Sequence, residues 1–139
     1  MNSLEARRID GCRVQEHVDD AIRVLVSLEL AFEDRSCLTL GCAADGRSLR
    51  AEPQPMGWSE VPDRGHIEIH SRHEVCGILR PGTMLTEERL LVDFGQHTIG
   101  VALATRDSAL YVFNWCGVLR CARDMPLELS AVLAAPPPT

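Results

Sequence analysis

One pattern of alternating apolar residues occurs twice in the chain and constrains its fold more than any other feature. The first copy, Ile22–Phe32, is apolar at every even position, and a polar turn then leads into the apolar run Cys37–Leu40. The second copy repeats this order, with an apolar run that ends at Phe94, a short turn, and a further apolar run over 98–103. Because side chains alternate between the two faces of a β-strand, this period of two predicts strands rather than helices.

The rest of the chain adds further short strands and turn signals. Additional strands are predicted at Gly11–Val18, Leu49–Glu52, His66–His70 and Ser108–Trp115. Asp45-Gly46 indicates a tight hairpin turn, and the length of Ile22–Phe32 predicts a bulge near Ser27. We therefore predict a mainly β fold, with an α+β fold as the variant: an antiparallel sandwich or curled sheet of about 7–9 short strands with one or two small helices.

The two ends of the chain and one internal segment have weaker patterns. Residues 1–10 are predicted to be a polar lead-in, and 86–89 fits either a brief helix or a strand that begins around Arg89. Pro126 suits the first position of a short helix over 126–133. The domain prediction is one β-rich unit over 1–125, followed by a short C-terminal helix and a Pro-rich tail over 126–139.

The repeated pattern has two explanations. A duplicated β unit would give two halves, at about 11–52 and 76–121. An ordinary antiparallel meander repeats strand, turn and strand without any duplication, and it explains the pattern equally well. Both explanations lead to the same fold class.

Charge and composition exclude several functions. The net charge is −6, which argues against binding to nucleic acid because such proteins need a basic surface. All 14 basic residues are arginine, so Schiff-base lysines and phosphate-binding P-loop lysines are excluded. No apolar run approaches the ~18 residues of a membrane span, and the N-terminus has no secretory apolar region. We expect a cytoplasmic protein in which the six cysteines are reduced.

The histidine-rich segment is the one candidate for metal chemistry. His66, Glu68 and His70 share one face of the predicted strand, and two imidazoles at that spacing are able to bind Zn²⁺ or Fe²⁺. A solvent-facing strand with a polar face has the same sequence. Neither Ser59 nor the pair of His73 and Cys76 lies in a frame typical of a catalytic nucleophile. We predict no catalytic residue, no resident metal and no cofactor.

Acidic residues at predicted turns and strand ends are the candidates for binding a partner. Carboxylates gathered at one rim would complement a basic protein, and tryptophan is enriched at the energetically important positions of interfaces. Trp58 lies in a Pro-rich loop and is the better interface candidate of the two tryptophans, because Trp115 is expected in the core. The predicted partner-binding residues are Glu33, Asp34, Asp45, Trp58, Glu87, Glu88 and Asp107.

Two stretches carry a resemblance: the strand-turn-strand segment from Leu28 to Arg50 and the run Leu110–Trp115. With these stretches, and in size, charge and patterning, the chain resembles the small, acidic, β-rich immunity proteins of bacterial polymorphic toxin systems, including those of type VI secretion. The resemblance implies a cytoplasmic, non-enzymatic protein that binds a cognate toxin, expected to be basic, and occludes its active site. It carries over no functional residue, because these proteins share no signature.

Two other functions remain open at this point. One is a metal-binding enzyme or sensor that uses the strand with His66 and His70. The other is a structural or assembly module that forms a homodimer through exposed strands. The sequence is compatible with a monomer or a homodimer. We expect the protein to bind neither nucleic acid nor a membrane.

Overall fold

The computed structural model describes residues 6–59 and 62–134, and this part of the chain is a nine-stranded antiparallel sheet with two short helices. The strands are β1 (Arg7–Asp19), β2 (Ile22–Phe32), β3 (Cys37–Cys42), β4 (Leu49–Glu52), β5 (His66–His70), β6 (Met84–Val92), β7 (Thr98–Thr105), β8 (Ala109–Trp115) and β9 (Val118–Ala122). The helices are α1 (Glu74–Ile78) and α2 (Leu127–Ser130). The predicted mainly β fold is therefore confirmed, in its curled-sheet form.

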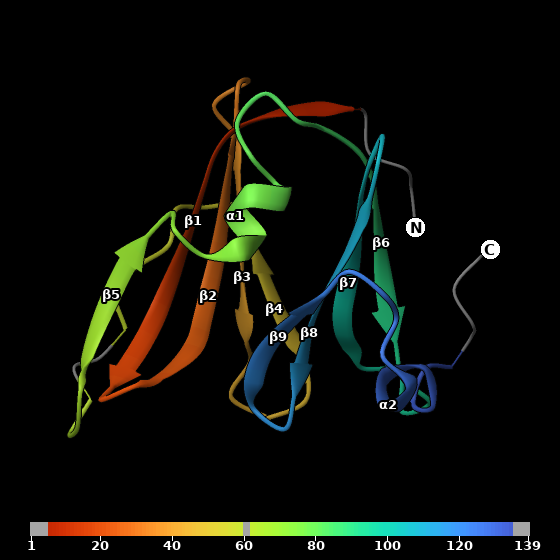
Figure 1. The fold of residues 1–139 in the computed structure, drawn as a ribbon. Helices are drawn as coiled ribbons and strands as arrows, with labels where there is room; N and C mark the ends of the chain where they lie inside the picture. Colours follow the sequence, from red (N-terminus) through yellow and green to blue (C-terminus); the bar gives the residue numbers. More distant parts are fainter. Residues whose placement is uncertain (1–5, 60–61, 135–139) are drawn as a thin grey trace.

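The long strand β1 joins two halves of the sheet. The order is β4-β3-β2-β1-β6-β7-β8-β9, and β5 pairs with the C-terminal part of β1 while β6 pairs with its first two residues. The runs β1–β4 and β6–β9 are each a meander in which consecutive strands are hydrogen-bonded neighbours. The sheet curls so that β2 contacts β9 and β3 contacts β8, as the two leaning groups of strands in Figure 1 show. Whether the halves arose by duplication stays a prediction.

The main core lies between the two halves. Alternate residues of β1, β2 and β3 point inward and meet side chains from β7, β8 and β9. Helix α1 lies between the halves in Figure 1 and adds Val75, Cys76 and Leu79 to this core. A second, smaller core forms on the other face of β6–β9, where Leu129 and Leu133 cover Leu91 and Phe113. Among the described residues, no helix is long and apolar enough to cross a membrane.

The bulge predicted near Ser27 is present. Gln15 pairs with Ser27 while the next residue, Glu16, pairs with Leu25, so Val26 is the extra residue on β2. Because an extra residue bends its strand and increases the twist, the bulge contributes to the curl of the sheet.

Four local predictions are corrected by the structure. β1 begins at Arg7 rather than at Gly11, because Ile9 is buried and the first residues of the strand pair with β6. Residues 86–89 belong to β6, which begins at Met84, and form no helix. The β3–β4 connection is a six-residue loop closed by the Asp45 carboxylate, not a two-residue turn. The C-terminal helix covers only Leu127–Ser130, and the tail from 135 onward lies outside the described residues.

Candidate functional site

The loop that follows β4 crosses the face of the sheet opposite to the main core. This face of β1, β2 and β3 is polar because Arg13, Gln15, Ser27, Glu29 and Thr39 alternate with apolar residues that point into the core. Such polar side chains need hydrogen-bond partners when they are buried. The loop over residues 53–59, here called the Trp58 loop, supplies many of those partners from its backbone.

Gln15 binds the second half of the Trp58 loop. Its side-chain amide is buried, and its Nε2 donates to Ser27 Oγ (3.1 Å) and to the carbonyl of Gly57 (2.9 Å). Its Oε1 accepts a hydrogen bond from the backbone N–H of Ser59 (2.7 Å). One side chain therefore holds the loop on both sides of Trp58.

Glu29 and Thr39 bind the first half of the loop. Glu29 is buried, accepts two hydrogen bonds from the Arg13 guanidinium (2.8 and 3.0 Å), and accepts a third from the Met56 N–H (2.8 Å). Burial raises the pKa of Glu29, but the hydrogen bonds from Arg13 and Met56 outweigh it and hold the pKa below its ordinary value. Thr39 Oγ1 donates to the carbonyl of Gln54 (2.7 Å). The loop backbone is thus tied to three strands.

This anchoring directs neighbouring side chains in opposite directions. Met56 is buried, with 8% of its surface exposed, whereas the Trp58 side chain stands in solvent with 71% exposed. A large aromatic side chain on an ordered backbone is the arrangement that protein interfaces use for their strongest contacts, because little conformational freedom is lost on binding. The sequence predicted Trp58 as an interface residue, and the structure places it on such a loop.

The predicted acidic residues do not form one rim. Glu33 and Asp34 lie in the β2–β3 turn, whereas Asp45 lies in the β3–β4 loop at the opposite end of β3. The six residues of β3 separate these positions by about 20 Å. Glu87 and Glu88 lie within β6, and Asp107 lies in the β7–β8 turn at the upper end of Figure 1.

Of the acidic residues predicted to bind a partner, Glu33 shares a hollow with the Trp58 loop. It lines a shallow hollow of about 460 Å³ together with Pro55 of the loop and the strand residues Arg13 and Glu29. Its carboxylate pairs with Arg8 at 3.4 Å, and Asp34 beside it accepts hydrogen bonds from Ser36. The Trp58 loop and the β2–β3 turn therefore border one continuous surface.

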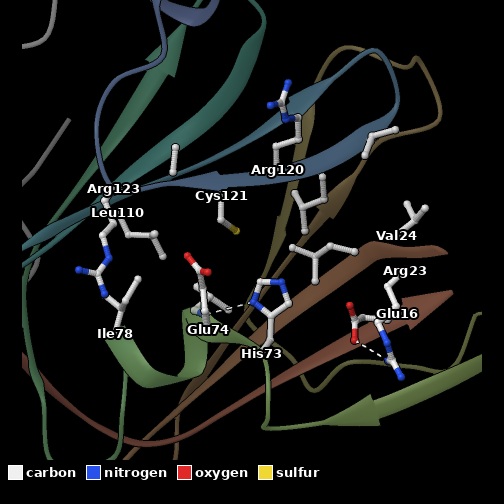
Figure 2. Close-up of a pocket in the computed structure, with 15 residues that line it drawn as sticks. Glu16, Arg23, Val24, His73, Glu74, Ile78, Leu110, Arg120, Cys121 and Arg123 are labelled. Carbon is white, nitrogen blue, oxygen red and sulfur yellow. Dashed lines mark hydrogen bonds and ion pairs between the residues drawn. The ribbon is translucent and has the colours of Figure 1, made fainter. Parts of the chain in front are cut away.

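A second hollow, of about 380 Å³, lies between α1, β9 and the strands β1 and β2 (Figure 2). At one edge the buried carboxylate of Glu16 pairs with Arg23 (3.2 Å) and accepts a hydrogen bond from His70. The backbone N–H of Arg72 donates to His70 Nδ1 (3.0 Å), so the ring proton lies on Nε2, facing Glu16. These groups bind one another and hold β1, β2 and β5 together.

His73 and Cys121 also line this hollow. His73 points into it in Figure 2, and its Nδ1 caps α1 by accepting the Val75 N–H (3.1 Å). Burial, with the nearby Glu74 and Cys76, raises the pKa of the Cys121 thiol to about 12, so this thiol is protonated at neutral pH. A protonated thiol is a poor nucleophile.

The polar side chains of the histidine-rich strand pair with one another and with neighbouring residues. His66 Nε2 lies 2.8 Å from Glu68 Oε2, and Glu68 also pairs with Arg23 (3.0 Å). Within residues 6–59 and 62–134, no three His, Cys, Asp or Glu side chains gather in a metal-binding arrangement. His66, Glu68 and His70 do lie on one strand as predicted, and their partners come from β1, β2, the strand itself and Arg72 just after it.

Comparison with known proteins adds no further assignment. No family model matches the chain, and neither a curated protein nor a solved structure matches it.

The residues that the sequence did not single out, Gln15, Glu29 and Thr39, are the ones that anchor the Trp58 loop. A signal for them does exist: they are polar residues inside otherwise apolar strands, and they fall on one face.

Proposed function

We propose that this protein is a cytoplasmic, non-enzymatic binding protein that neutralises a cognate bacterial toxin by covering its active site, and that the Trp58 loop makes the central contact. One observation carries the proposal: a tryptophan with 71% of its surface exposed stands on a loop whose backbone is hydrogen-bonded to the buried side chains Gln15, Glu29 and Thr39. Tryptophan is enriched at the energetically important positions of interfaces, and an ordered backbone reduces the entropy lost when it binds.

Charge supports the same proposal. The net charge of −6 suits a basic partner, and complementary charge accelerates association more than it strengthens the final complex. Glu33 borders the hollow beside the Trp58 loop, and Asp34 follows it in the β2–β3 turn, so this turn is a source of such steering. Raising the salt concentration should therefore slow association with little change in the dissociation rate.

Trp58→Ala should weaken the complex by about tenfold or more, the loss typical of removing a central interface aromatic. The partner is the basic protein that co-purifies with the tagged chain from its native lysate, and affinity is measured by calorimetry. Leu127→Ala is the matched control, because Leu127 is 87% exposed on α2, on the other half of the sheet.

Capture alone is insufficient, so the same proteins are tested for neutralisation. Expression of the captured protein in a bacterial host should arrest growth, and co-expression of the wild-type chain should restore it. Restoration should be lost with Trp58→Ala and retained with Leu127→Ala. If the captured protein is harmless, or if a second copy of this chain is the only protein captured, the toxin-neutralising function is wrong.

A further inference from the structure

A third hollow lies at the end of the sheet opposite to the β2–β3 turn. It has a volume of about 510 Å³ and is bordered by the β3–β4 loop, the β6–β7 turn, the β8–β9 turn and the residues that follow α2. These connections lie together at the lower end of Figure 1. The hollow, here called the end socket, has aromatic walls from Phe94 and Trp115 and carries carboxylates from Asp45 and Asp93.

A buried amide fixes the connections around the end socket. Asn114 is buried, and its Nδ2 donates to the Ser48 carbonyl at the end of the β3–β4 loop (2.9 Å). Its Oδ1 accepts the Gly117 N–H of the β8–β9 turn (2.8 Å). After α2, Ala134 N–H donates to the Val92 carbonyl beside the β6–β7 turn (2.8 Å). Because these bonds join separate segments, the end socket is formed before any ligand arrives.

The two carboxylates are held in place and charged. Asp45 accepts hydrogen bonds from Ser48 and from the Arg47 N–H, which lower its pKa to about 2. Asp93 accepts the His97 N–H (2.9 Å), which also holds its pKa below the ordinary value. Both are therefore ionised at neutral pH, and both line the hollow together with Arg47. Asp93 Oδ1 also lies 3.3 Å from the side-chain Nδ1 of His97.

The two aromatic side chains that line the end socket, Phe94 and Trp115, are its most distinctive feature. Phe94 is 74% exposed at the apex of a turn, where a polar residue is the ordinary choice. Trp115 packs edge-on against Phe113, with ring centroids 6.3 Å apart and an interplanar angle of 83°, so its ring orientation is fixed. Aromatic faces beside carboxylates attract a flat organic cation through both charge and the ring quadrupole.

We propose that the end socket receives an arginine side chain of the protein partner, with the guanidinium beside Asp45 and Asp93 and its plane against Phe94 or Trp115. Arginine suits this site better than lysine because its planar group stacks on aromatic rings and binds carboxylates with two N–H donors. This inference rests on the proposed function, since a basic protein partner is what supplies the arginine. It adds a second contact, at the opposite end of the molecule from Glu33.

The test uses the protein without its partner. A Trp58→Phe variant leaves Trp115 as the only tryptophan, so its fluorescence reports on the end socket alone. We titrate this variant with N-acetyl-argininamide and, as a matched probe, with N-acetyl-citrullinamide, which has nearly the same shape and no charge. Arginine should change the Trp115 emission saturably, and citrulline should bind at least about fivefold more weakly.

Two further variants test the geometry. Phe94→Ala removes an exposed wall without disturbing the core and should weaken arginine binding about fivefold. Arg47→Ala removes a positive charge from the lining of the end socket and should strengthen arginine binding about two- to fivefold, a change that an apolar site would not show. Backbone amide shifts of Gly46, Gly95 and Gly117 in the nuclear magnetic resonance spectrum provide a second readout.

The inference is overturned if neither the Trp115 emission nor these amides respond to arginine, if citrulline binds equally well, or if Arg47→Ala leaves the affinity unchanged. These outcomes are distinguishable from failure of the proposed function, which is measured with the partner and the Trp58→Ala variant. If Trp58→Ala abolishes neutralisation while the arginine probe fails to bind, the end socket alone is rejected.

Discussion

Glu29→Ala is expected to free the first half of the Trp58 loop and to lower the stability of the protein by about 1–3 kcal/mol. The substitution removes the acceptor of the Met56 N–H, which is then left without its hydrogen bond beneath the loop, and a buried donor without a partner costs roughly that amount. Arg13 loses its bidentate partner as well, but its half-exposed guanidinium regains water. Partner affinity should fall with stability, because the loop must then be ordered on binding.

Urea denaturation followed by circular dichroism measures the stability change. Glu128→Ala is the matched control, because Glu128, on the helix α2 that packs against β6–β9, makes a partly exposed ion pair with Arg120 (4.0 Å) and should change stability by less than about 1 kcal/mol. Equal stability of Glu29→Ala and the wild type would show that the anchoring by Glu29 is unimportant.

The Glu29 contribution also has a defined pH dependence. Its pKa is lower in the folded protein than the ordinary value of 4.5, so its stabilisation is complete above that pH and is lost as the pH falls through the lower, folded-state pKa. The stability difference between the wild type and Glu29→Gln should therefore shrink below pH 4.5. A difference that grows with acidity would contradict the hydrogen-bonding scheme.

Leu103→Ala should have the largest effect on folding, a loss of about 2–5 kcal/mol. Leu103 on β7 is 0% exposed and belongs to the core between the two halves of the sheet. Leu90→Ala on the neighbouring β6 is the control, because Leu90 is 43% exposed and should lose less than about 1 kcal/mol. Thermal and urea unfolding measure both. If both variants lose less than about 1 kcal/mol of stability, Leu103 does not lie in a core between the two halves of the sheet.

The alternation of apolar residues predicted the limits of three strands. β2 has the predicted limits of Ile22 and Phe32 although it contains a bulge, and β4 and β5 also match. β6 was partly missed because Thr86 forms a bulge in the pairing with β7, which breaks the alternation just where Glu87 and Glu88 add exposed charge. The start of β1 depends on pairing with the distant β6, and no local pattern predicts that contact.

Composition and loop character predicted Trp58 as a site residue. They did not predict Gln15, Glu29 and Thr39, the residues that hold the Trp58 loop in place. These are side chains on three strands that contact a loop tens of residues away in sequence. Asp34 and Asp45 were predicted from their positions in turns, and both are exposed in the structure. Their carboxylates accept hydrogen bonds from residues of their own turns. A turn-capping role and a binding role use the same residue types, so sequence alone does not separate them.

The most direct test of an ordered Trp58 loop is hydrogen exchange of the Met56 and Ser59 backbone amides in the isolated wild-type protein. These two amides donate to Glu29 and Gln15, so they should exchange far more slowly than unstructured amides, even though they lie in a loop. Gln15→Ala should accelerate exchange at Ser59 more than at Met56. Exchange of both amides at the unprotected rate in the wild type would contradict the account, because Trp58 would then stand on a loop with no fixed conformation.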